Sequence, residues 1–215
     1  MEHELNDKQR QIMEKALEVF AEKGFDSASV RDIAQRAEVN VAMISYYFGS
    51  KEKLLEAIFK KYTGFMTRKI EEIIHSTTLA PFEKVDLLID TYVNIIIEHK
   101  TFHKVMMREQ VLLTEGPLFA YIREMKLNSR NLIEIAVKVG QKTGVFQKQV
   151  DAGMLAVTLI GTVNHFFSNH KYVCGETKLK SSSIEDYDIK AIEKLRSHIK
   201  KMFTAFLTYG ISNKK

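Results

Sequence analysis

The sequence predicts an all-α protein of about nine helices, because apolar residues recur at helical spacing along nearly the whole chain and no strand-length alternation competes with them. The chain has 215 residues with only two prolines and ten glycines, and 45% of it is hydrophobic. This length allows a small domain joined to a larger one. We expect a three-helix N-terminal domain at residues 1–53 and a larger helical domain at residues 54–215.

The first helix is expected over residues 5–23, and Gly24 ends it. Its apolar residues fall on one stripe, formed by Ile12, Ala16, Val19 and Phe20. A second, short helix begins after Ser29, which has the Ser-x-x-Asp spacing of a capping box with Asp32. In this arrangement each side chain satisfies a free backbone N–H of the other residue.

A third helix follows almost at once. Asn40 is a good N-cap, and the helix that it begins runs to about Phe48, before Gly49. Two helices with so short a connection cross steeply, which is the layout of a DNA-reading helix-turn-helix. Ser50 then caps a fourth helix, which we expect to continue to residues 74–75 and to link the two domains mechanically.

The same region resembles a known family. The matching pattern is Ala16-x3-Phe20-x3-Gly24-Phe25, then Ser29-Val30-x2-Ile33-Ala34-x2-Ala37-x-Val39-Asn40, then Ile44-x-Tyr46-Tyr47-Phe48-x-Ser50-Lys51-Glu52-x-Leu54. In this spacing, without insertions, the chain is similar to the N-terminal domain of the tetracycline-repressor (TetR) family. The resemblance implies a transcriptional regulator that binds double-stranded DNA as a homodimer and senses a small molecule with its second domain.

Five further helices complete the prediction. They are expected over residues 82–98, 102–113, 118–139, 151–170 and 187–209. Pro81 lies at the first turn of the helix over 82–98, and residues 100–101 separate that helix from the one over 102–113. Gly140 ends the helix over 118–139, and Asp151 caps the helix that follows it. Residues 171–186, rich in Lys and Ser, are expected to form a loop.

The last two helices predict a homodimer. Apolar residues occupy most of the circumference of the first of them, whereas a helix on a monomer surface shows one apolar stripe. They are Met154, Leu155, Val157, Ile160, Val163, Phe166 and Phe167. The final helix carries its own apolar stripe, so two helices from each chain would pair about a two-fold axis, as the resemblance also implies. A monomeric bundle that wraps residues 151–170 completely is the alternative.

The DNA contacts are expected on and around the third helix. The expected set is Ser29, Arg31, Asn40, Val41, Ala42, Met43, Ser45, Tyr46, Tyr47 and Lys51. The resemblance assigns phosphate contacts to Tyr46 and Lys51, and assigns contacts with the DNA backbone to Ser29 and Arg31. A guanine base is the alternative target of Arg31.

Short side chains on the third helix force a close approach to base edges in the major groove. Val41, Ala42 and Met43 are able to touch thymine methyl groups. Asn40 meets either phosphate or base, and Tyr47 faces either the DNA or the core. Because Val41 and Ser45 depart from residues common in the family at these positions, the operator sequence is not readable from them.

An effector pocket between helices needs apolar walls and a few polar groups. The candidate residues are Tyr92, His99, Phe102, His103, Met106, Met107, Tyr121, Met125, Asn128, Asn164, His165 and Phe166. As a group they favour a largely hydrophobic effector, although each is also explained as part of an apolar core. The pairs His99/His103 and His165/His170 lack a Cys or acid at ligand spacing, so we expect no metal and no cofactor.

The net charge is +5, but residues 1–53 carry 8 Lys and Arg against 10 Asp and Glu, whereas residues 171–215 carry 10 against 5. DNA binding would therefore depend on local groups and not on bulk charge. The C-terminal lysines form either a solvated face or a second nucleic-acid site. With Cys174 as the single cysteine, no signal peptide and no membrane-spanning run, we expect a cytoplasmic protein that does not bind membranes.

The chain carries no G-x-S-x-G, G-x-x-x-x-G-K or H-E-x-x-H motif, so we expect no catalytic residues and no enzyme. The alternative function is a helical scaffold that uses the helix-turn-helix as a docking surface for protein, which the acidic balance of residues 1–53 supports. In the favoured interpretation, effector binding moves the fourth helix as a lever and changes the separation of two DNA-reading helices.

Overall fold

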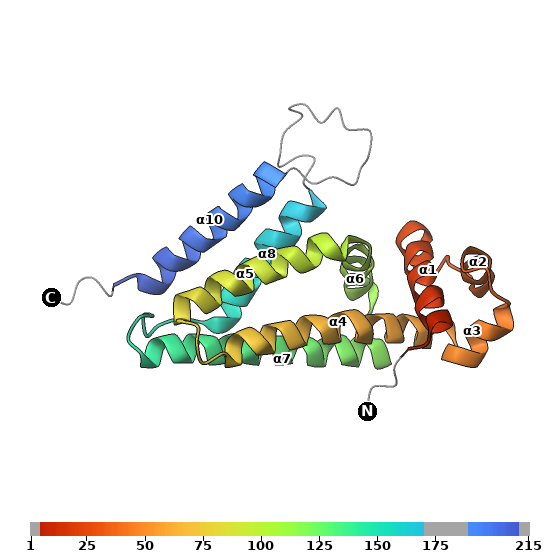
Figure 1. Cartoon of the computed structure of the whole chain (residues 1–215), viewed down its shortest axis with the longest axis horizontal. Helices are drawn as coiled ribbons and strands as arrows, with labels where there is room; N and C mark the ends of the chain where they lie inside the picture. Colours follow the sequence, from red (N-terminus) through yellow and green to blue (C-terminus); the bar gives the residue numbers. More distant parts are fainter. Residues whose placement is uncertain (1–4, 170–188, 211–215) are drawn as a thin grey trace. The chain divides into compact units, whose positions relative to one another are not determined.

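The computed structural model describes residues 5–169 and 189–210 (Figure 1). All regular structure in these residues is helical, which confirms the predicted all-α class. The nine described helices are α1 (Asp7–Lys23), α2 (Val30–Arg36), α3 (Val41–Phe48), α4 (Lys51–His75), α5 (Pro81–Glu98), α6 (Lys100–Leu112), α7 (Pro117–Lys142), α8 (Ala152–Ser168) and α10 (Ile189–Thr208).

Most predicted helix ends are confirmed, because they are encoded by local caps. Gly24 follows α1 at a φ of 83° and Gly49 follows α3 at a φ of 82°, in a region that favours glycine. Asn6 forms a capping box with Gln9, so α1 begins at Asp7. The carboxylate of Asp151 accepts the Met154 N–H at 3.0 Å and begins α8.

Two predicted interruptions are wrong. Residues 100–101 lie inside α6, because the chain breaks earlier, at His99, whose φ is −121°. Gly140 lies inside α7, where a side chain would overlap the ring of Phe146. That ring is buried and meets Phe82 edge-on at 4.9 Å between centroids. Close packing, and not helix termination, explains this glycine.

Some predictions lie outside the described residues: His170, Cys174, the expected loop at residues 171–186 and the expected first residues of the last helix. Among the helices that are described, none is both long and apolar enough to cross a membrane.

The helices group into two compact units. One comprises Met1–Arg68 with Ile95–Lys126, and the other comprises Lys69–Asn94 with Leu127–Lys215. Helices α4, α5 and α7 each contribute residues to both units. The two units reflect which residues pack together and do not test where one functional domain ends. The domain boundary expected between residues 53 and 54 therefore stays a prediction.

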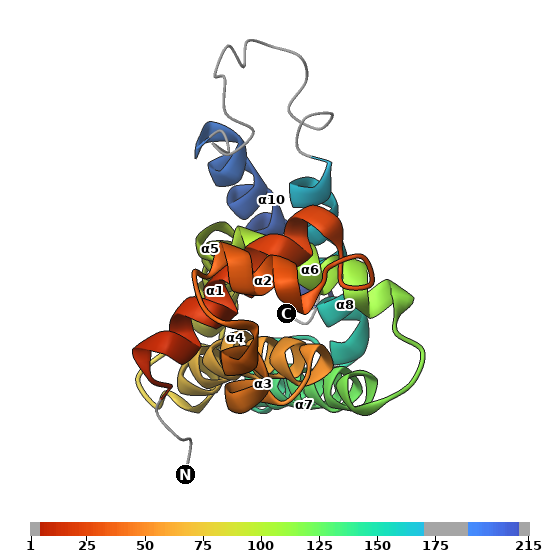
Figure 2. The same cartoon turned by 90° about the vertical axis from the view of Figure 1, so that its right-hand side faces the viewer.

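In the first unit, the helix-turn-helix is built on one apolar core, and α2 contacts both α1 and α3 (Figure 2). Buried residues from six helices belong to this core, among them Phe20 (α1), Ile33 (α2), Ile44 (α3), Ile58 (α4), Phe102 (α6) and Ile122 (α7). The sequence predicts a core from the first four helices only. Burying each such side chain contributes about 1.5–3 kcal/mol before entropic costs, so α6 and the beginning of α7 help to hold the helix-turn-helix.

In the second unit, charged groups tie α10 to α5. Asp90 accepts hydrogen bonds from Arg196 Nη1 at 3.0 Å and from Lys200 Nζ at 2.6 Å, and Arg196 Nη2 donates to Asn94 Oδ1 at 2.6 Å. The apolar stripe of α10 is buried, through Ile192, Leu195, Ile199, Phe203 and Leu207. Helix α10 therefore buries most of its apolar face within its own chain.

Candidate nucleic-acid interface

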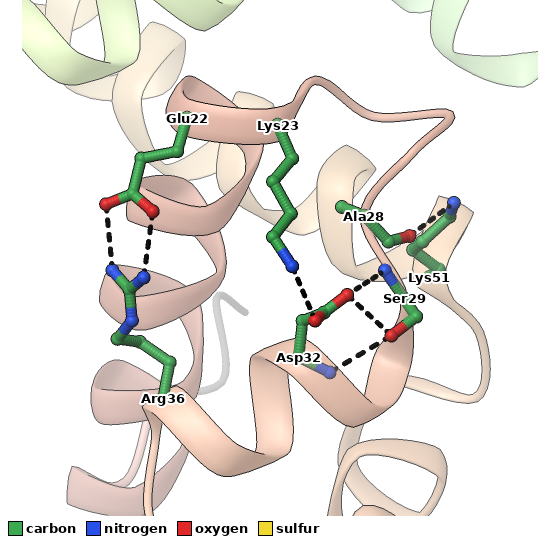
Figure 3. Close-up of polar contacts among 7 residues, drawn as sticks. All are labelled: Glu22, Lys23, Ala28, Ser29, Asp32, Arg36 and Lys51. Carbon is green, nitrogen blue, oxygen red and sulfur yellow. Dashed lines mark hydrogen bonds and ion pairs between the residues drawn. The ribbon is translucent and has the colours of Figure 1, made fainter.

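The start of α2 is fixed by the predicted capping box (Figure 3). The Asp32 N–H donates to Ser29 Oγ at 3.1 Å, while the Asp32 carboxylate accepts from the Ser29 N–H at 2.9 Å and from its hydroxyl at 2.6 Å. Lys23 Nζ, at the end of α1, donates to the same carboxylate at 2.6 Å. These hydrogen bonds hold the pKa of Asp32 well below its usual range, and the bond from Lys23 has the largest effect.

A second polar contact joins α2 to α1. Arg36 donates two hydrogen bonds to the carboxylate of Glu22, at 2.9 and 2.8 Å (Figure 3). Arg36 Nη1 also lies 3.6 Å from Glu18 Oε2. The Arg36 hydrogen bond lowers the pKa of Glu22. Arg36 is thus engaged within the protein, and its bidentate contact joins α2 to α1.

Lys51, the first residue of α4, holds the loop between α1 and α2. Its Nζ donates to the carbonyl oxygen of Ala28 at 2.9 Å (Figure 3). It also donates to the Phe25 carbonyl at 2.8 Å and lies 4.3 Å from the centre of the Phe25 ring. The ammonium satisfies carbonyl groups that no helix uses. No local sequence pattern indicates this role, and the predicted phosphate contact of Lys51 stays a prediction.

Helix α6 reaches the same loop. Glu109 is only 4% exposed, and burial raises the pKa of its carboxyl, while the Phe25 backbone N–H opposes this shift. A side chain at Gly24 would overlap the guanidinium of Arg108. No local pattern predicts these contacts, because the two segments are far apart in the sequence.

The orientation of α3 is fixed by what it buries. Ile44 is buried, and Tyr47 is half-buried and packs against the core of the first unit. Of the two predicted orientations of Tyr47, toward the DNA or toward the core, the structure has the second. The opposite face is exposed and consists of Val41, Ala42, Ser45 and Tyr46. Tyr46 is 82% exposed. This face is available to a partner.

The remaining predicted DNA-contacting residues lie around this face. Asn40 caps α3 by accepting the Ala42 N–H at 2.8 Å, and Met43 is half-buried. Ser29 and Arg31 are exposed at the start of α2. The Arg31 side chain has no hydrogen bond or ion pair to any described residue, and neither has that of Lys53 at the start of α4. These two cations remain available for phosphate.

The predicted effector-contacting residues fall in both units. In the first unit, Tyr62 stacks on Phe102 at 4.6 Å and meets His99 edge-on at 5.1 Å, and the Tyr121 hydroxyl is hydrogen-bonded to that of Thr63 at 2.6 Å. Met106 and Met125 pack against the same core, His103 is buried in α6, and Met107 accepts from Gln110 at 3.0 Å.

In the second unit, Tyr92 donates to Asn164 Oδ1 at 3.1 Å, and burial raises the pKa of its hydroxyl. Phe166 is buried against Phe167, whereas Asn128 and His165 are exposed. No group of three or more His, Cys, Asp or Glu in the described part of the chain has a metal-binding arrangement. Which of these residues contact an effector stays a prediction.

Comparison with known proteins shows two matches to family models. Residues 12–58 match the model described as bacterial regulatory proteins, tetR family, and residues 78–168 match that of the tetracyclin repressor-like C-terminal domain. The first match contains the helix-turn-helix, and the second contains α5, α6, α7 and α8.

Two curated relatives match most of the chain. The HTH-type transcriptional repressor KstR2 of Mycobacterium tuberculosis is 24% identical over 152 residues, which cover 71% of this chain and 76% of that protein. The fatty acid metabolism regulator protein of Bacillus subtilis is 27% identical over 159 residues, covering 73% of this chain and 80% of that protein.

Solved structures share the fold. The ketosteroid transcriptional regulator KstR2 of Mycobacterium tuberculosis superposes with a TM-score of 0.70 at 18% identity, covering 95% of both chains. The regulator FadR of Bacillus subtilis, in complex with stearoyl-CoA, does so with a TM-score of 0.71 at 22% identity, covering 92% of this chain and 98% of that one.

Lys51→Met is expected to lower the free energy of unfolding by about 1–2 kcal/mol, because it removes the ammonium that donates to the Ala28 carbonyl and one of the two donors of the Phe25 carbonyl. Urea unfolding followed by circular dichroism, at one protein concentration, measures this. Lys53→Met removes an exposed cation from the same helix and should change the value by less than about 0.5 kcal/mol. Equal effects of the two substitutions would contradict the role of Lys51.

Asp32→Asn is expected to make stability less dependent on pH. The pKa of Asp32 is lowered in the folded protein from its ordinary value of 3.8, so its charge stabilises the fold above that pH. The stability difference between the native protein and Asp32→Asn should be constant from pH 7 to about 5 and shrink as the pH falls from about 4 toward 2. Urea midpoints across this range test it, and a difference independent of pH would refute it.

Proposed function

Because this chain belongs to the TetR family of bacterial transcriptional regulators, we propose that it is a repressor that binds a palindromic DNA operator as a homodimer and leaves it when a small, largely hydrophobic effector binds. The family is not enzymatic, and its members bind DNA through the helix-turn-helix. The observation that carries the proposal is the outward face of α3, which ends in the almost fully exposed Tyr46.

The proposed DNA contacts divide between bases and phosphates. Val41, Ala42 and Ser45 on α3 approach base edges in the major groove, and the hydroxyl of Tyr46 donates to a phosphate. Arg31 reaches the DNA from α2, supported by the capping box that fixes the start of that helix. The acidic balance of residues 1–53 does not oppose this, because cations such as Arg36 are engaged internally and Arg31 and Lys53 are not.

The proposed dimer forms mainly through α8. One face of this helix is buried in its own chain, whereas Met154, Val157 and Ile160 on another face are 59%, 62% and 39% exposed. A side-chain carbon added at Gly161, on the same side, would have no other atom within 4 Å, so a second helix has room to approach closely. From α10, Phe206 is available at 45% exposure. Such an apolar stripe on a helix favours burial against a partner.

A two-fold dimer explains why the operator would be a palindrome. Each subunit presents one α3, and the symmetry axis relates the two half-sites. The centres of the half-sites are then separated by about one helical turn, 34–36 Å, or a multiple of it.

The proposed effector is a large apolar molecule of the fatty-acyl or steroid kind. Two observations support it. The relatives include a fatty acid metabolism regulator and a ketosteroid regulator, and one similar structure holds stearoyl-CoA. In this chain, most candidate pocket residues are aromatic, Met or His, and Met adapts readily to a bulky apolar ligand.

The proposed switch uses α4. The first half of α4 contributes Leu54, Ile58 and Phe59 to the core that includes the helix-turn-helix. Its last turn contributes Ile74 to an apolar cluster of the second unit. An effector that binds the released arrangement more tightly than the operator-binding one shifts the population toward release. A continuous helix transmits that shift.

The DNA-binding proposal predicts that the full-length protein selects a palindrome from a randomised library and binds it with strong salt dependence in fluorescence anisotropy. Tyr46→Phe should weaken binding at least about tenfold, since a hydrogen bond to a charged group contributes about 1.5 kcal/mol or more. Tyr209→Phe, which alters an exposed tyrosine of the other unit, is the matched control and should bind normally. A salt slope near zero, or no selected palindrome, would refute the proposal and favour a docking scaffold.

The dimer proposal predicts that Val157→Glu converts the protein into a folded monomer that binds the operator weakly, because a charge in an apolar interface is costly. Analytical ultracentrifugation at micromolar concentration measures the mass. Val111→Glu, at a 75% exposed valine of α6, should stay dimeric. A native protein that sediments as a single chain would overturn the proposal.

A further inference from the structure

We propose that α3 recognises its half-site chiefly through the methyl groups of thymine, with Val41 and Ala42 as the residues that determine specificity. This inference rests on the proposed function and names the chemistry of the DNA that the same site selects.

The first argument is the chemistry of the outward face. Within Val41–Phe48 there is no charged residue and no Asn or Gln. Guanine is read best by Arg or Lys, and adenine by a bidentate Asn or Gln, so α3 has no side chain for either bidentate pattern, and the Ser45 hydroxyl offers a single hydrogen bond that either base can meet. The thymine methyl group is the one apolar feature that a base pair shows in the major groove, and aliphatic side chains complement it.

The second argument is the engagement of Asn40. Its side-chain oxygen accepts the Ala42 N–H at 2.8 Å and begins the helix. A bidentate contact with adenine uses both the oxygen and the nitrogen of the amide. Because the cap holds the oxygen toward the backbone, Asn40 is not oriented as an adenine reader.

The third argument is the fixed rotation of α3. Ile44 is buried and Tyr47 packs against the core, so the helix cannot turn a different face outward without exposing them. Val41, at 40% exposure, and Ala42 stand on the first turn of the exposed face, the part of a recognition helix that meets base edges.

Energetics then favour thymine at the contacted positions. An aliphatic side chain against a thymine methyl group removes apolar surface from water on both partners. Against cytosine or guanine the same side chain would cover polar groups without giving them a hydrogen-bond partner. The preferred half-site therefore has thymines facing Val41 and Ala42.

The test uses the full-length protein and the palindrome selected from the randomised library. Each thymine of a half-site is replaced in turn by deoxyuridine, which pairs identically but lacks the methyl group. We expect one or two positions per half-site where this replacement weakens binding about fourfold, the affinity equivalent of one buried methyl group.

The same replacements are then measured with Val41→Ala. At the position that Val41 contacts, most of the deoxyuridine effect should disappear, whereas it should persist with Val145→Ala, which alters a valine of similar exposure outside the helix-turn-helix. Circular dichroism checks that Val41→Ala is folded, as expected for an exposed residue replaced by a better helix former.

Two results would overturn the inference. If the protein selects a palindrome but no deoxyuridine replacement weakens binding, or Val41→Ala leaves every such effect unchanged, methyl recognition is wrong while the proposed function stands. If no sequence is selected at all, the proposed function fails and the inference fails with it.

Discussion

The arrangement of the helix-turn-helix depends on how the short loop between α1 and α2 is held. Lys51 Nζ donates to the carbonyl oxygens of Phe25 and Ala28, and α6 places Glu109 and Arg108 against the same loop. A loop has no helical partners for its polar groups, so these contacts replace them. They hold the loop that leads into α2, whose first residue is set by the capping box of Ser29 and Asp32.

The same internal pairing explains how an N-terminal region with more acids than bases can serve a DNA-binding protein. Lys23, Arg36 and Lys51 are engaged with Asp32, Glu22 and backbone carbonyls inside the first unit. The two exposed ion pairs among these contacts contribute little energy individually, but they keep Lys23 and Arg36 occupied within the protein. The groups left for the DNA are then few, and those on α3 are all uncharged, which supports the methyl contacts that we propose.

Helices α8 and α10, whose apolar residues led us to predict a dimer, differ in how much of their apolar surface is buried within the chain. Both are apolar, yet α10 buries its stripe within its own chain and is secured by Arg196 and Lys200 on Asp90. Helix α8 is apolar on two faces and buries only one, leaving Met154 and Val157 exposed. The case for self-association therefore rests on α8, with α10 acting mainly to complete the second unit.

The sequence by itself determined the helical class, the helix-turn-helix and most helix ends, because caps such as Ser29 with Asp32, or Asn40 with Ala42, are hydrogen bonds between residues a few positions apart. Only the tertiary structure decided the roles that depend on distant partners. Gly140 is required by Phe146 and does not end its helix, and Lys51 and Glu109 hold a loop that no local pattern connects to them. The physical reason is that caps act within one helical turn, whereas packing and burial join segments whose separation along the chain carries no signal.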